Sequence, residues 1–67
     1  MKIQINGASE EVDEGATLLD YMKGKGFDPA LVSVEHNGRI LDKDEWPAVI
    51  LRSDDELEIL FFMGGGM

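Results

Sequence analysis

Apolar and polar residues alternate in the first part of the chain, as they do in a strand with one buried face. The opening segment MKIQING follows this period-two pattern. Asn6-Gly7 then predicts a hairpin turn, because both residues tolerate positive φ. The return strand, residues 9–13, has one apolar residue, Val12, and its charges are typical of an edge strand that avoids pairing with other chains.

The period changes to that of a helix after residue 16. Thr17, followed three residues later by Asp20, is typical of an N-cap with an acidic first turn. Gly24 and Gly26 keep the helix short, because glycine is costly in a helix interior and favoured at the C-terminal cap. The apolar residues between these signals are three and four apart and share the face that covers the sheet: Leu18, Leu19 and Met22.

A second hairpin follows the helix. Residues 32–35 alternate again, Asn37-Gly38 predicts the turn, and residues 39–41 return. Asp54-Asp55 is interpreted as a turn into the last strand, residues 56–63.

Two hairpins around one helix, with a long final strand, predict an α+β fold of the β-grasp (ubiquitin-like roll) type. We expect a five-stranded mixed sheet with one main helix, in which the first and last strands are parallel. Residues 1–63 form the domain, residues 42–47 a polar connection within it, and residues 64–67 a flexible Gly-Gly-Gly-Met tail. The predicted core is Ile3, Ile5, Val12, Leu18, Met22, Val34, Ile40, Trp46, Leu57 and Ile59.

Composition limits the chemistry available to this chain. Its 67 residues suit one small domain with little core to spare for a catalytic pocket. The absence of cysteine excludes a disulfide framework, a thiolate zinc site, an iron–sulfur cluster and a thiol nucleophile. The single histidine, His36, is interpreted as an ordinary strand-end residue, so we expect no metal site and no catalytic residue.

The chain is strongly acidic, with 14 acidic against 6 basic residues and a net charge of -8. Such a surface repels a phosphate backbone, so nucleic acid is not an expected partner. The acidity is typical of a solvated surface, and steering toward a basic protein is the other interpretation. No run approaches the ~18 apolar residues of a membrane span, so we expect a cytoplasmic protein without membrane contact.

The end of the last strand is unusually apolar. One short helix cannot cover both faces of a sheet, so the run that ends this strand is only partly covered. The alternative is a strand end buried on both sides. We predict a protein-docking patch, because soluble monomers seldom leave large apolar patches unused, formed by Leu60, Phe61, Phe62 and Met63.

The three glycines after this strand, Gly64, Gly65 and Gly66, have no side chains to pack. A glycine arm can enter a narrow channel in another protein and approach a nucleotide phosphate closely. Its terminal carboxylate would be the group on which a partner enzyme acts. An untidy tail is the alternative, since three glycines alone are weak evidence.

The segments MKIQING, EGATLLDYM, VSVEHNGRIL and DDELEILFFMGGG, in this order, resemble the ThiS-type sulfur carriers over almost the whole chain. The resemblance implies a terminal glycine carboxylate that an E1-like adenylating enzyme activates with Mg-ATP. Sulfur then comes from a cysteine desulfurase, and the resulting thiocarboxylate donates it to an acceptor such as thiazole synthase. No bound cofactor is implied.

Met67 departs from the pattern of this family, whose chains end in glycine. With Met67 present, Gly66 is locked in a peptide bond and cannot be adenylated. The resemblance therefore implies that Gly66 carries the sulfur only after Met67 is removed. Some similar carriers have such an extension, removed by a metalloprotease, and they often serve amino-acid rather than thiamine synthesis.

Two further functions remain open on the sequence. A ubiquitin-like interaction or modifier domain would use the last strand to bind a partner, with an idle or conjugated tail. The small subunit of molybdopterin synthase shares the glycine end but is usually longer. An enzyme is poorly supported, because the serine, threonine and histidine residues show no triad spacing.

Overall fold

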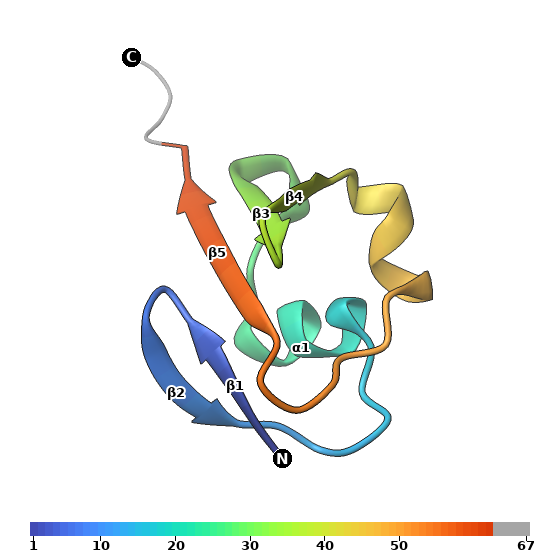
Figure 1. Cartoon of the computed structure of the whole chain (residues 1–67). Helices are drawn as coiled ribbons and strands as arrows, with labels where there is room; N and C mark the ends of the chain where they lie inside the picture. The colour runs from blue at the N-terminus through green and yellow to red at the C-terminus, as the bar shows by residue number, and fades with distance from the viewer. Residues whose placement is uncertain (63–67) are drawn as a thin grey trace.

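The computed structural model describes residues 1–62, and Met63 and the predicted tail lie outside them. The described residues form a five-stranded mixed sheet and one α-helix, α1 (Leu18–Lys25), which confirms the predicted β-grasp fold. In order across the sheet, β2-β1-β5-β3-β4, β5 is central and parallel to β1, and the other pairs are antiparallel (Figure 1). The strands are β1 (Lys2–Ile5), β2 (Ala8–Glu11), β3 (Val32–His36), β4 (Arg39–Leu41) and β5 (Glu56–Phe61).

Both predicted hairpin turns are present, with the backbone that their sequences favour. Asn6 and Gly7 have φ of 50° and 85°, and Asn37 and Gly38 have φ of 51° and 87°. Two successive residues with positive φ match the right-handed twist of the strands that they join.

The helix begins and ends where the sequence predicts. The Thr17 hydroxyl accepts a hydrogen bond from the backbone N–H of Asp20, and the Asp20 carboxylate accepts one from the backbone N–H of Thr17, both at 3.1 Å. The hydrogen bond from the Thr17 backbone N–H to the carboxylate, followed by the contribution of the Thr17 side chain, lowers the pKa of Asp20. At the other end, Gly26 adopts φ of 75° and caps the helix.

The core lies between α1 and one face of the sheet. The predicted core positions on β3, α1 and β5 are buried, while Ile5 and Val12 are half-buried at its border. The prediction is wrong for Ile40, which is 65% exposed. Its neighbour Leu41 lies opposite Val34 and takes the inward position, and successive strand residues point to opposite faces. Residues missing from the predicted core are Tyr21, Val32, Leu41 and Leu51.

The connection after β4 is more ordered than the predicted polar loop. It forms a 3-10 helix, η2 (Lys43–Ala48), which packs against α1 and buries Trp46 to 2% exposure. A shorter 3-10 helix, η1 (Pro29–Leu31), precedes β3. No helix among residues 1–62 is long and apolar enough to cross a membrane.

Candidate functional site

The end of β5 carries the predicted docking residues that the structure describes. Leu60, Phe61 and Phe62 are 56%, 51% and 58% exposed. The strand ends at Phe61, earlier than predicted, and Met63 lies outside the described residues together with Gly64, Gly65, Gly66 and Met67. The alternative of a strand end buried on both sides is therefore wrong for residues 60–62.

Contacts with the segment before β3 hold this strand end in place. The Phe61 ring meets the Phe27 ring edge to face, with centroids 5.1 Å apart and an interplanar angle of 78°. The backbone N–H of Phe62 donates to the carbonyl of Leu31 at 2.8 Å, one residue beyond the end of the strand. The chain therefore leaves the sheet from a fixed position, with three apolar side chains still exposed.

Two asparagines in the hairpin turns also position β5. The side chain of Asn6 accepts from the backbone N–H of Ile59 at 2.7 Å and donates to its carbonyl at 3.2 Å. The side chain of Asn37 accepts from the backbone N–H of Glu56 at 2.8 Å, and the backbone N–H of Asn37 donates to the Glu56 carbonyl, also at 2.8 Å. The Asn-Gly pattern identified both turns, but nothing in it indicates a side-chain partner more than fifty residues away.

His36 and Asp55 come together at the start of β5. His36 Nε2 lies 3.0 Å from Asp55 Oδ2, and the side chain of Asn37 donates to Asp55 Oδ1 at 3.1 Å. The backbone N–H of Arg52 donates to the same carboxylate at 2.8 Å. Burial alone would raise the pKa of Asp55, but these hydrogen bonds hold it below its ordinary value.

This cluster has the geometry of a structural clasp. It joins the turn before β5 to the turn between β3 and β4. His36 ends β3, as predicted, but its contact with Asp55 was not predicted from the sequence. Among residues 1–62, no group of three or more metal-ligating side chains is close enough to hold a metal ion.

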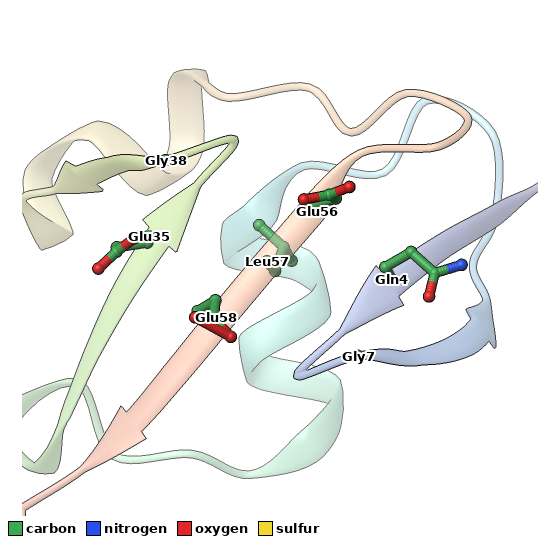
Figure 2. A pocket seen from close by; sticks show the side chains of 7 residues that line it. All are labelled: Gln4, Gly7, Glu35, Gly38, Glu56, Leu57 and Glu58. Carbon is green, nitrogen blue, oxygen red and sulfur yellow. The ribbon is translucent and has the colours of Figure 1, made fainter.

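A shallow depression of about 390 Å³ lies over the first half of β5. Figure 2 shows side chains from β1, β3 and β5 along it, with α1 behind the sheet. Leu57 forms part of its floor, and the residues around it include Gln4, Gly7, Glu35, Gly38, Glu56 and Glu58.

Comparison with known proteins connects this architecture to a family. A sequence model described as the ThiS family matches residues 3–66. A thiazole synthase from Magnetococcus marinus is 39% identical over 66 residues, and one from Paramagnetospirillum magneticum is 35% identical over 66 residues. These matches cover 98% of this chain but 20% of each relative, so the chain spans about a fifth of the length of these relatives.

A solved structure agrees in both fold and sequence. The crystal structure of a thiamine biosynthesis protein (ThiS) from Geobacter metallireducens has a TM-score of 0.82 and 32% sequence identity to this chain. The match covers 98% of this chain and 100% of that one. Because the family match runs over nearly the whole chain and the strand order is that of a β-grasp sheet, the chain belongs to the ThiS family.

Proposed function

We propose that this chain is a sulfur carrier of thiamine biosynthesis, which partner enzymes act on and which is not itself a catalyst. The observation that carries the proposal is the family match, which extends through the glycines to Gly66 and leaves Met67 outside. The structural likeness to a thiamine biosynthesis protein supports the pathway. The relatives named thiazole synthase support an enzyme of that kind as the sulfur acceptor.

The chemistry takes place at the carboxylate of Gly66 once a metalloprotease has removed Met67. An E1-like enzyme binds this carboxylate and Mg-ATP, and a carboxylate oxygen attacks the α-phosphate, with pyrophosphate as the leaving group. The terminal sulfur of a cysteine-desulfurase persulfide then attacks the acyl carbon and displaces AMP. A second thiol cleaves the resulting S–S bond, which leaves a thiocarboxylate on Gly66 and a disulfide on the thiols. The thiocarboxylate donates its sulfur to the thiazole synthase.

Removal of Met67 can be tested with two versions of the chain. The version that ends at Gly66 should support ATP–pyrophosphate exchange by the cognate adenylating enzyme, while the full chain should remain near background. Gly66→Ala in the shorter version should slow exchange strongly, because glycine adds no bulk next to the α-phosphate and reaches backbone angles closed to other residues. Equal exchange by both versions would show that Met67 does not block activation.

The sulfur itself can be detected in protein isolated from its own cell. The carrier function predicts loss of Met67 and a gain of about 16 Da at the new end, from the exchange of one oxygen for sulfur. A ubiquitin-like modifier would instead appear as a branched conjugate through Gly66 to a lysine of another protein.

We further propose that the end of β5, residues 60–63, docks the adenylating enzyme. Exposed apolar side chains beside the start of the glycine arm place that arm at the entrance of the enzyme's active site. Phe62→Asp should weaken binding by more than ~2 kcal/mol, as expected for a central aromatic contact. Ile50→Asp is a matched control, because Ile50 is 56% exposed but lies outside the docking segment. Unchanged binding by a folded Phe62 variant would show that the docking surface lies elsewhere.

A further inference from the structure

Each hairpin turn contains an asparagine followed by a glycine, and these are the two asparagines of the chain, Asn6 and Asn37. Their backbones are alike, with φ of 50° and 51°, and the glycines Gly7 and Gly38 lie on either side of β5 (Figure 2). An asparagine before glycine is prone to lose its side-chain amide, because glycine has no side chain to hinder attack by its backbone nitrogen. The sequence therefore gives both positions a similar reactivity, and any difference must come from the fold.

We propose that Asn37 is the deamidation site of this chain and that the fold protects Asn6. In this reaction the backbone nitrogen of Gly38 attacks Cγ of Asn37 and forms a C–N bond, while the bond from Cγ to Nδ2 breaks. The proton of the Gly38 nitrogen leaves with the amide nitrogen as ammonia. Water then opens the cyclic succinimide at either carbonyl carbon, which gives aspartate or isoaspartate. Apart from its chain neighbours, no described residue lies within 4 Å of a Cβ placed on Gly38, so the turn is open to this water.

The side chain of Asn6 takes the place of a neighbouring strand for the middle of β5. It accepts from the backbone N–H of Ile59 at 2.7 Å and donates to the Ile59 carbonyl at 3.2 Å. Ile59 lies beyond the last residue pair of β1 and β5, Ile5 with Leu57, and is 4% exposed. If Asn6 turns away, two backbone groups of a buried residue lose their partner, which is costly. The amide of Asn6 is therefore rarely free to cyclise.

The side chain of Asn37 is held at the exposed start of the same strand. Its Oδ1 accepts from the backbone N–H of Glu56 at 2.8 Å, and Glu56 is exposed, so water can replace this bond. Its Nδ2 donates to Asp55 Oδ1 at 3.1 Å. When that bond opens, the Asp55 carboxylate keeps its contacts with His36 and with the backbone N–H of Arg52. Hydrogen bonds at an exposed strand end open at lower cost than those in the core, so Asn37 reaches the reactive arrangement more often.

Deamidation at this position would weaken the clasp at the start of β5. The nitrogen that donates to Asp55 at 3.1 Å becomes a carboxylate oxygen. A hydrogen bond is thereby replaced by a contact between two negative charges. The modified chain should therefore unfold more readily than the unmodified one.

The first test follows the ageing of the full chain at neutral pH. Peptide mapping by mass spectrometry measures the gain of about 1 Da at each asparagine, in the folded chain and in the chain unfolded by guanidinium chloride. In the unfolded chain the two positions should react at rates within about twofold of each other, because a glycine follows both. In the folded chain Asn37 should react at least about fivefold faster than Asn6, because its hydrogen bonds open more often.

Equal rates at the two positions of the folded chain, or faster reaction at Asn6, would overturn the proposal. A folded chain in which neither asparagine reacts would overturn it as well, because the turn at Asn37 would then be fully protected.

A second test examines the effect of the reaction product on the clasp. Asn37→Asp reproduces the new carboxylate and should lower the urea concentration at which half of the chain is unfolded. The same substitution in an Asp55→Asn background should lower it less, because the facing charge is gone. Equal losses in the two backgrounds would show that the new carboxylate does not meet Asp55 and would overturn the predicted weakening of the clasp.

Discussion

The two faces of β5 differ sharply in the burial of their side chains, although they belong to one strand. On the face toward α1, Leu57 and Ile59 are 1% and 4% exposed and join a continuous core. On the other face, Glu58 and Leu60 are exposed. Glu58 lies opposite another glutamate, Glu35. The face toward α1 supplies the core, and the other face, the open face, leaves its apolar and charged side chains in water.

This difference shows what one short helix can do for a five-stranded sheet. Helix α1 and η2 lie on the same side, so the apolar residues that close the core all point there. Apolar residues of the opposite parity, such as Ile40 and Leu60, remain exposed to water. Each of the following predictions tests where this division between the faces holds.

The largest expected effect comes from two identical substitutions on one strand. Leu57→Ala should lower the free energy of unfolding by about 2–5 kcal/mol, because Leu57 is fully buried and a cavity would remain. Leu60→Ala removes the same atoms from the open face and should cost less than about 0.5 kcal/mol. Urea unfolding of the two variants measures both. Similar losses would mean that the two faces do not differ in this way.

The fold was predictable because its signals are local. Alternation identified the strands, Asn6-Gly7 and Asn37-Gly38 identified the turns, and Thr17 with Gly26 marked the ends of the helix. The failure at β4 has a physical reason. Two adjacent apolar residues in a three-residue strand leave its phase undetermined, and only pairing with Val34 shows that Leu41 and not Ile40 points inward.

The site was less predictable because it depends on residues far apart in the sequence. The limited cover of one short helix correctly indicated that Leu60 and Phe62 are exposed. Parity cannot show that Glu35 lies opposite Glu58, since that requires the register between β3 and β5. The contacts of Asn6 with Ile59 and of His36 with Asp55 likewise depend on the folded topology.

The hydrogen-bonded carboxylate of Asp55 at the start of β5 tests how much a buried polar group contributes to the stability of the fold. Asp55→Asn should lower the free energy of unfolding at neutral pH by about 1–3 kcal/mol, because a buried acceptor of three hydrogen bonds is altered. The neighbouring Asp54→Asn is the control, since asparagine keeps the positive φ of 69° at that position.

The same variant has a distinct pH signature. The pKa of Asp55 is below its ordinary value of 3.8 in the fold, so the unfolded chain binds protons more readily. The stabilisation from this carboxylate is complete above the unfolded pKa and is lost as the pH falls through the folded pKa. Asp55→Asn should therefore flatten the loss of stability below about pH 5. If the free energy of unfolding of the variant falls as steeply with decreasing pH as that of the unsubstituted chain, Asp55 does not contribute to the acid sensitivity.

A smaller loss of stability is expected for substitution of Asn6, whose side chain forms hydrogen bonds with the backbone of β5. Asn6→Gly keeps the positive φ of the turn but loses both bonds to Ile59. The cost should be about 1 kcal/mol, the net contribution of ordinary hydrogen bonds after exchange with water, partly raised by the flexibility of glycine. Urea unfolding measures this loss of stability. The amide of Ile59 should exchange faster in the variant, and an unchanged exchange rate would show that the bond from Asn6 does not protect it.

The smallest effect should have the opposite sign. Glu58→Gln removes one of two facing carboxylates on the open side, so it should raise the free energy of unfolding by a few tenths of a kcal/mol, at the low end of the range for cross-strand pairs. The gain should shrink in high salt, because both side chains are accessible to screening ions. In a double-mutant cycle with Glu35→Gln, the second substitution should add little, since the first already relieves the repulsion. A loss of stability, or gains that simply add, would mean that the two carboxylates do not repel each other across β3 and β5.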